Sequence, residues 1–155
     1  MFTDDPFTVF PIDYVDRKGQ RRVFYVFPEP IRMQFGKQRR EFLIRTNSSI
    51  PASGTDRVFQ LDLEEDNDGW WRVDMIGQTS NYTEFERCGL PDELILAVAR
   101  RFSLQICCST FEEFQMPKAK DVWGRLKKRF DEIPGDFRVE VVTGRFRLVP
   151  TGRTR

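Results

Sequence analysis

One stretch of this sequence has the length of a short helix and is apolar on almost every side. Residues 94–102 read L-I-L-A-V-A-R-R-F, with charge only at Arg100 and Arg101 near the end. A helix without a polar face has to be covered all round, and a sheet is the usual cover in a small domain. Residues 89–93 supply a helix start, with proline in the first turn and acids at the positive end of the dipole. We therefore expect one buried helix packed against a sheet.

Four short stretches in the first third of the chain have the composition of β-strands. They are rich in β-branched and aromatic residues and are separated by proline and glycine, which is typical of strands between turns. We place these strands at residues 7–10, 21–27, 31–35 and 41–46. Pro11 is expected to end the first strand, and a turn over residues 36–40 is expected to precede the fourth.

The clearest hairpin follows at residues 58–76. Phe59, Leu61 and Leu63 alternate with polar residues, which predicts a strand with one apolar face. The acidic segment 65–69 ends in glycine and supplies a turn, after which residues 70–76 return as the partner strand.

The last third of the chain predicts a strand, a helix and a hairpin. Residues 103–108 have the apolar character of a short interior strand. Residues 117–130 form an amphipathic helix. Its apolar stripe consists of Ala119, Val122, Trp123, Leu126 and Phe130. Residues 137–142 and 145–149 form a hairpin around a Thr-Gly turn.

These segments predict an α+β (mixed α/β) fold with a central, largely antiparallel sheet and two main helices. The predicted element order is β-meander–α–β–α–β–β, preceded by the N-terminal strands. We expect a single domain over residues 1–155, in which residues 1–56 contain the first strands and residues 150–155 form a frayed basic tail.

The composition excludes much of the common catalytic chemistry. The chain contains no histidine, so it can hold neither a Ser-His-Asp nor a Cys-His apparatus, nor an imidazole metal site. Cys88, Cys107 and Cys108 have no Cys-x-x-Cys spacing, which favours reduced, buried thiols and no metal. Acids stand near the N-terminus where a secretory signal has lysine or arginine, and no apolar run approaches the ~20 residues that cross a bilayer. The sequence thus predicts a cytoplasmic protein that does not enter the membrane.

Charge is strongly segregated although the net charge is only +1. Residues 17–45 contain nine basic and two acidic residues, whereas residues 62–93 contain ten acidic and two basic residues. Residues 118–155 are basic again, with eleven basic and five acidic residues. Such blocks are solvated strand faces and turns, complementary surfaces of one fold, or a bipolar surface for charged partners.

Two segments of the second half resemble the Gcn5-related N-acetyltransferase (GNAT) superfamily. They are R-C-G-L-P-D-E-L at residues 87–94, followed by the apolar helix, and I-C-C-S with A-K-D-V-W-G-R-L at residues 106–109 and 119–126. In that superfamily a glycine-containing loop after a central strand opens a helix whose N-terminus holds the pyrophosphate of acetyl-coenzyme A. A strand and a second helix commonly follow. The resemblance covers residues 57–149.

The resemblance implies an acyltransferase that moves an acetyl group from acetyl-coenzyme A to an amine. Its phosphate-binding residues would be Arg87, Cys88, Gly89, Leu90 and Asp92. Asp74 or Glu84 would take a proton from the acceptor amine, and Ser109 or Tyr82 would assist the departing thiolate. From the residues alone, the carboxylates Asp74 and Glu84 can equally belong to an ordinary acidic surface.

A second function class is a non-catalytic interaction module, such as an inhibitor or immunity-type factor. It would present the segregated charges to a macromolecular protein partner. Nucleic-acid binding is a third, less favoured interpretation, based on basic residues along the second helix and the C-terminal hairpin. The middle of the chain is acidic, which argues against it.

Overall fold

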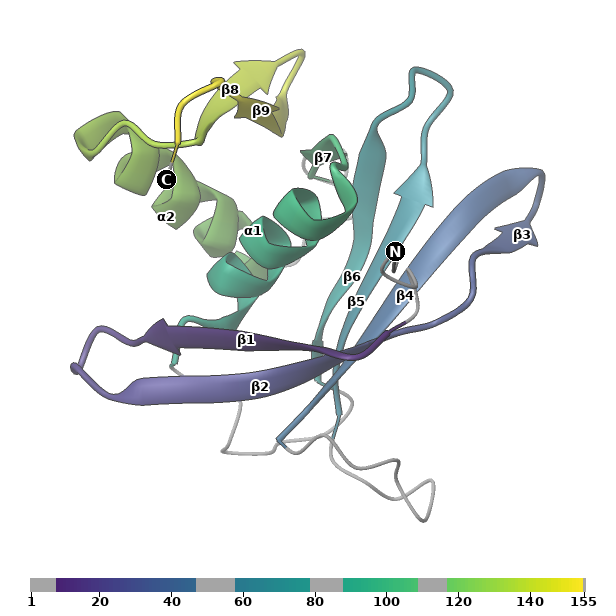
Figure 1. The fold of residues 1–155 in the computed structure, drawn as a ribbon. Coiled ribbons are helices and arrows are strands. Elements are labelled where there is room, and N and C mark those ends of the chain that lie inside the picture. The colour runs from purple at the N-terminus through teal and green to yellow at the C-terminus, as the bar shows by residue number, and fades with distance from the viewer. Residues whose placement is uncertain (1–7, 47–57, 79–87, 109–116, 155) are drawn as a thin grey trace.

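A computed structural model describes residues 8–46, 58–78, 88–108 and 117–154 of the chain. Those residues form nine strands and two helices, labelled in Figure 1. The strands are β1 (Phe10–Val15), β2 (Arg21–Pro28), β3 (Arg32–Gln34), β4 (Lys37–Arg45), β5 (Phe59–Glu65), β6 (Trp71–Gln78), β7 (Ile106–Cys107), β8 (Phe137–Val142) and β9 (Arg145–Pro150). The helices are α1 (Leu90–Phe102) and α2 (Pro117–Glu132).

All of the described strands belong to one mixed sheet. Its order is β1-β2-β4-β5-β6-β7-β9-β8, and β3 pairs with β4 beside this path. The paired strands are antiparallel except for β6 and β7, which are parallel. Parallel neighbours need a crossover connection, and α1 lies in the one between β6 and β7. The predicted α+β class, with a largely antiparallel sheet and two helices, is therefore confirmed.

The helix α1 lies at the centre of the core, as its apolar sequence predicts. Leu94, Ile95 and Leu96 have no exposed surface although they are consecutive. The sheet curves around α1, with β1 and β2 along one side of it and β6 along another (Figure 1). The inner face of the sheet supplies alternate residues of the longer strands, such as Leu61 and Leu63 of β5, to the same core. None of the helices in the described residues has the length and apolar content that a membrane span requires.

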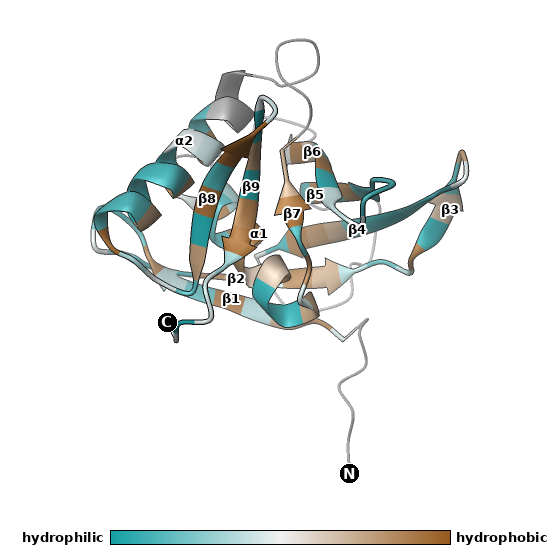
Figure 2. Ribbon diagram, turned by 90° about the horizontal axis from the view of Figure 1, so that it is seen from above, coloured by the Kyte–Doolittle hydropathy of each residue, from teal (hydrophilic) through white to brown (hydrophobic). Residues whose placement is uncertain are grey.

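The second helix packs one face against the C-terminal hairpin. Val122, Trp123, Leu126 and Phe130 are buried, which confirms most of the predicted stripe; the side chain of Ala119 lies outside the described part. The indole of Trp123 stacks on the ring of Phe146 in β9, with 6.3 Å between the ring centroids and 5° between the planes. The outward side of α2 is hydrophilic (Figure 2). This aromatic contact fixes α2 over the hairpin.

Two predicted boundaries in the first third are wrong. The first strand begins at Phe10 and continues through Pro11. Because β1 pairs only with β2, Pro11 sits on an edge strand, where a missing N–H is tolerated. The turn is predicted over residues 36–40. In the structure it consists of Phe35 and Gly36, and β4 begins at Lys37. Consecutive arginines therefore lie within the strand, where they point to opposite faces of the sheet.

Candidate functional site

The parallel strands β6 and β7 are paired at only two positions. Trp71 lies opposite Ile106, and Arg72 lies opposite Cys107. After Arg72, no strand in the described residues pairs with the edge of β6 that faces β7. The helix α1 starts beside the end of β1, on the side of the molecule toward which β6 runs, and continues back toward β7 (Figure 1). Open α/β sheets bind ligands outside the carboxyl ends of parallel strands, so this end of the pair is the first candidate site.

A glycine opens α1 at this place. Gly89 is the N-cap residue and has φ 73° and ψ 12°, in the left-handed region that glycine adopts without strain. Pro91 follows in the first turn and lacks an N–H that would need a partner. Because glycine has no side chain, the first N–H groups of the helix have no side-chain cap, which is the arrangement found where helix starts bind anions.

Tyr14 holds the segment before α1 in position. Its hydroxyl donates a hydrogen bond to the carbonyl oxygen of Cys88 at 2.7 Å. Burial, and then the hydrogen bond to Cys88, raises the pKa of Tyr14, so the phenol keeps its proton. Sequence reasoning missed this contact because Tyr14 and Cys88 are 74 positions apart. The alternation of Phe10, Ile12 and Tyr14 in β1 places the tyrosine on the inner face, but does not identify its partner.

Arginines from α2 engage the acidic residues of the first turn of α1. The guanidinium of Arg125 donates two hydrogen bonds to the carboxylate of Asp92, at 2.8 and 3.0 Å. Arg129 donates to Glu93 at 2.8 Å. A bidentate pair of this kind is stronger than a single contact. The carboxylates at the helix start are thus neutralised by a partner helix, although in sequence they would repel an anion.

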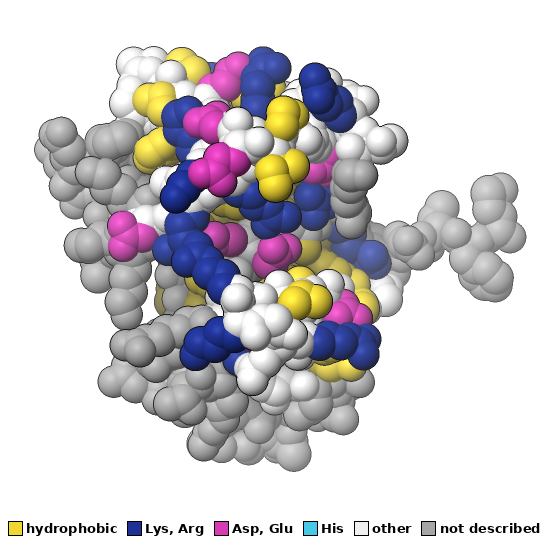
Figure 3. Space-filling model, turned by 90° about the vertical axis from the view of Figure 1, so that its left-hand side faces the viewer, with side chains coloured by type: hydrophobic (Ala, Val, Ile, Leu, Met, Phe, Trp, Pro, Cys, Tyr) yellow, Lys and Arg dark blue, Asp and Glu magenta, His cyan; other side chains and the backbone are white. Residues whose placement is uncertain are grey.

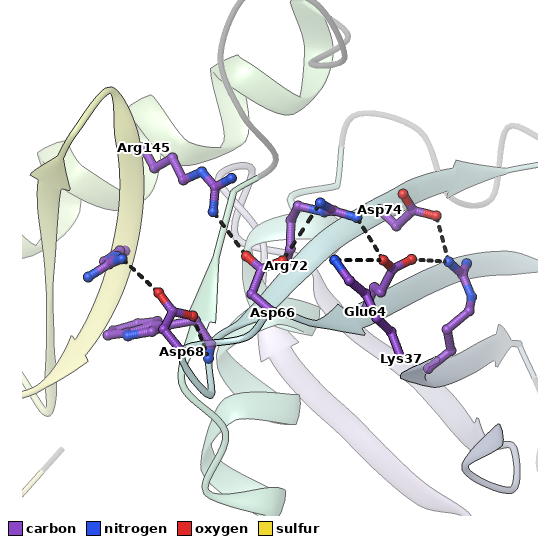
Figure 4. A network of polar contacts seen from close by, with 10 residues as sticks. Lys37, Glu64, Asp66, Asp68, Arg72, Asp74 and Arg145 are labelled. Carbon is purple, nitrogen blue, oxygen red and sulfur yellow. Dashed lines mark hydrogen bonds and ion pairs between the residues drawn. The ribbon is translucent and has the colours of Figure 1, made fainter. Parts of the chain in front are cut away.

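The outer face of the sheet, turned away from the helices, carries a second group of polar residues. The strand registers place Arg39, Glu64, Arg72, Cys107 and Arg147 opposite one another in a single row from β4 to β9. Ion pairs along and beside this row form a network from β4 to β9, with Arg147 and Asp68 as a separate pair at its edge (Figure 4). We call it the outer-face network; its members are Lys37, Arg39, Asp62, Glu64, Asp66, Asp68, Arg72, Asp74, Arg145 and Arg147.

The outer-face network ties the C-terminal hairpin to the central strands. Arg145 contacts Asp66 at 2.9 Å, and Arg147 contacts Asp68 at 3.3 Å. These two aspartates belong to the turn between β5 and β6, so the contacts bridge the short strand β7. Arg72 reaches both Glu64, at 3.1 Å, and Asp66, at 3.7 Å. Since each carboxylate faces at least one cation, the network is a charge-balanced connection and not an open binding site.

Asp74, a predicted proton acceptor, belongs to this network. The register of β5 and β6 shifts between Asp62 and Leu63, which makes Asp74 the extra residue of a β-bulge. Its carboxylate accepts a hydrogen bond from Arg39 at 3.0 Å, and the same arginine nitrogen contacts Glu64 at 2.9 Å. The side chain of Asp74 is 41% exposed, so solvent still reaches it. Bulges re-aim side chains and are frequent beside active sites, which keeps Asp74 a candidate.

Asp62 gives the network a pH dependence that can be measured. Burial raises the pKa of Asp62, although Gln60 donates a hydrogen bond to its carboxylate at 2.8 Å. A raised pKa means that the folded chain holds this proton more tightly than the unfolded chain. Protonated Asp62 therefore stabilises the folded chain. This contribution is fully present below the ordinary pKa of 3.8 and is lost as the pH rises through the pKa of Asp62 in the folded chain. We expect an Asp62→Asn variant to become more stable relative to wild type as the pH rises from 3.8 toward neutrality, in thermal melts.

An Asp13→Asn variant serves as the control with the opposite sign. A hydrogen bond from Arg21 lowers the pKa of Asp13, so that carboxylate stabilises the fold above its ordinary pKa and loses this effect in acid. The Asp13→Asn variant should become less stable relative to wild type as the pH rises. Parallel curves for Asp62→Asn and wild type at every pH would contradict the assignment for Asp62.

The remaining predicted site residues divide into two groups. Cys88, Gly89, Leu90 and Asp92 lie together at the start of α1, on the inner side of the sheet. Asp74 points to the outer side, so the two parts of the predicted site lie on opposite faces of β6. The other predicted residues lie outside the described residues; they are Tyr82, Glu84, Arg87 and Ser109.

The three cysteines are buried thiols, as predicted. Burial raises the pKa of Cys107 to about 12, and Asp66 in the outer-face network adds to this effect. Such a thiol is a poor nucleophile at neutral pH. In the described residues, no cluster of three or more histidine, cysteine, aspartate or glutamate side chains is placed to hold a metal ion.

Comparison of the chain with protein-family models, with curated proteins and with solved structures gives no match. Its function therefore has to be argued from the geometry of the chain.

Proposed function

We propose that the chain is an acyltransferase of the Gcn5-related type that binds acetyl-coenzyme A at the start of α1. The observation that carries the proposal is the β6–α1–β7 unit. Its parallel strands pair at two positions only, and α1 runs back along the sheet, so that its start lies toward the carboxyl end of β6. That end combines the usual ligand position of an open sheet with the positive end of a helix dipole. A pyrophosphate is the anion that the resemblance of residues 87–94 suggests for it.

The contacts from α2 support this placement. Asp92 and Glu93 would oppose a phosphate if they were unpaired, but Arg125 and Arg129 engage them. The positive end of α1 is then not cancelled by its own side chains. Tyr14 holds the carbonyl of Cys88, which fixes the backbone that would face the phosphates.

The proposed reaction is direct transfer of the acetyl group. The acceptor amine attacks the thioester carbonyl, its proton goes to Asp74 or Glu84, and the C–S bond breaks as the amide forms. Ser109 or Tyr82 gives a proton to the departing thiolate. Asp74 follows the two positions of β6 that pair with β7, so in this scheme the acceptor amine reaches its outer-face carboxylate past the unpaired edge of β6.

Thermal melts with acetyl-coenzyme A test the binding step. A ligand at a hundred times its dissociation constant adds about 2.7 kcal/mol to the unfolding free energy, a rise of about 5–10 °C in melting temperature. We expect this rise with acetyl-coenzyme A and with coenzyme A, but not with acetylpantetheine, which lacks the pyrophosphate. No rise with millimolar acetyl-coenzyme A would contradict the proposal.

Two variants on α2 locate the site. Arg125→Gln leaves the carboxylate of Asp92 unpaired beside the phosphates, so we expect it to weaken acetyl-coenzyme A binding about three- to tenfold. Lys127→Gln is the matched control, because Lys127 pairs with Asp131 on the exposed side of the same helix. Equal affinities in calorimetry for the two variants would place the cofactor elsewhere.

The alternative, a non-catalytic interaction module, loses part of its basis in the structure. The segregated charges pair with one another, since Arg39 contacts Glu64 and Arg145 contacts Asp66. Basic and acidic side chains are interleaved on the side of the molecule where α2 lies (Figure 3). The same pairs neutralise cations that a nucleic-acid interface would need. A different observation favours the alternative: the exposed apolar side chains of Met33 and Phe35 in the hairpin of β3 and β4.

A further inference from the structure

The hairpin of β3 and β4 ends in a phenylalanine that the body of the protein does not cover. Phe35 and Gly36 form its two-residue loop, with φ 53° and 77°. Positive φ at both loop positions is the type I′ geometry, in which asparagine and glycine are favoured. A bulky residue in this conformation is uncommon. Phe35 is 94% exposed, so no contact within the described chain explains why an aromatic ring stands there.

Phe35 belongs to an apolar stripe along β3. Ile31, Met33 and Phe35 alternate with Arg32 and Gln34, and the three apolar side chains are 40%, 64% and 94% exposed. The hairpin projects from the body of the protein, and Figure 2 shows hydrophobic residues toward its tip. A stripe of this kind on a projecting strand is typical of an interaction surface.

One edge of β3 is open. In the described residues β3 pairs with β4 alone. A two-residue loop makes Gln34 and Lys37 a hydrogen-bonded pair, so that the N–H and C=O groups of Met33 point away from β4. An unpaired edge with apolar side chains is a template for another strand.

We propose that β3 pairs with β3 of a second copy of this chain, antiparallel and about a two-fold axis through Met33. In this register Met33 faces Met33 of the second copy, and the loop residue Phe35 lies near Ile31 of the second copy. The stripe is therefore complementary to itself, as a two-fold interface requires. On the other side of the strands Arg32 faces Gln34 of the second copy, so like charges do not meet. A register shifted by two positions would set Arg32 against Arg32 and is disfavoured.

The two terminal strands of the sheet carry features that oppose such pairing. The terminal strand β1 contains Pro11 and an exposed aspartate, Asp13. The other terminal strand, β8, carries Arg138 and Glu140, which are 57% and 40% exposed. Proline and charged side chains are the usual protection of edge strands. Compared with these two edges, β3 is the one whose exposed side chains favour association.

The interface is small, so the dimer should be weak. Three apolar side chains and a short strand from each copy bury less than the roughly 1,200–2,000 Å² of a standard stable interface. We expect a dissociation constant on the order of 0.1–1 mM, so that the dimer forms only in concentrated solution.

Sedimentation equilibrium at increasing concentration tests the proposal. The average mass of the wild-type protein should rise from the monomer mass of 18.4 kDa toward twice that value at about 1 mM. A Phe35→Asn variant should raise the dissociation constant at least about tenfold, because it removes the aromatic side chain from both halves of the interface. Asparagine suits the type I′ loop, so the variant should fold at least as well as wild type in a thermal melt. Ile133→Asn is the control, since Ile133 is also exposed, at 73%, but lies at the end of α2.

Cross-linking tests the register. A short bismaleimide should join two chains through a Met33→Cys substitution, because these positions face each other, but not through Ile133→Cys. The native cysteines are at most 2% exposed and should not react. A wild-type chain that remains monomeric at about 1 mM overturns the proposal. So does association that survives Phe35→Asn, and so does an apolar tip that binds phospholipid vesicles while the chain stays monomeric.

Discussion

An Arg39→Met chain should lose about 3–5 kcal/mol of unfolding free energy, because removing one partner from a buried ionic cluster leaves uncompensated charges behind. The guanidinium of Arg39 is 11% exposed and lies within 4 Å of three carboxylates. Its distances to Asp62, Glu64 and Asp74 are 3.6, 2.9 and 3.0 Å. Methionine keeps most of the volume but removes the guanidinium that contacts all three carboxylates. Urea unfolding at neutral pH measures the loss.

Two controls separate this effect from the general loss of an arginine. Arg21 also pairs with an aspartate across neighbouring strands, but its side chain is 72% exposed. We expect Arg21→Met to cost less than about 1 kcal/mol, as exposed ion pairs do. In acid, where Asp62 takes up a proton, the cost of Arg39→Met should shrink. Equal costs for Arg21→Met and Arg39→Met would contradict the central position of Arg39.

The parts of the fold that sequence reasoning predicted are those fixed by local pattern. The apolar run at residues 94–102 requires burial on all sides, and α1 is buried. The alternation of Phe59, Leu61 and Leu63 predicts β5, and the stripe around Trp123 predicts the inner face of α2. Each of these patterns repeats within one element, so neighbouring residues are enough to recognise it.

The contacts that build the candidate site could not be predicted in this way, because they join distant segments. Arg125 and Asp92 are 33 positions apart, and Arg39 and Asp74 are 35 positions apart. The turn predicted over residues 36–40 placed Arg39 in a loop, whereas the strand begins at Lys37. The sequence places Phe35 in the strand over residues 31–35, whereas Phe35 and Gly36 form the loop; phenylalanine is unusual at the first position of such a loop.

The segregation of charge along the chain was visible in the sequence, but its meaning depended on topology. Opposite blocks come together because β4 lies beside β5, and because the C-terminal hairpin lies beside β7. Arg39 then meets Glu64, and Arg145 meets Asp66. The blocks therefore act as complementary surfaces of one fold, one of the alternatives that the sequence left open. Charge segregation by itself is consequently weak support for a charged partner.

A Trp123→Ala chain should lose about 3–5 kcal/mol of unfolding free energy, because replacing a large buried aromatic side chain with a methyl group leaves a cavity. The indole is 1% exposed and stacks on Phe146 with 6.3 Å between the ring centroids. This stacked pair joins α2 to β9. The near-ultraviolet circular dichroism should change as well, because the stacked pair is lost. Urea unfolding and this spectrum measure the two effects.

Trp123 and Arg125 both lie in α2, so the loss of Trp123 should also affect the candidate site. Trp123 lies two positions before Arg125, whose contact with Asp92 neutralises the start of α1. If the stacked pair sets the position of α2, Trp123→Ala should weaken acetyl-coenzyme A binding in the direction that Arg125→Gln does. Ile133→Ala, at a residue that is 73% exposed near the end of the same helix, should change the unfolding free energy by less than about 0.5 kcal/mol. A Trp123→Ala chain with the stability of Ile133→Ala would mean that α2 is held by other contacts, and the link between the core and the helix start would then have to be abandoned.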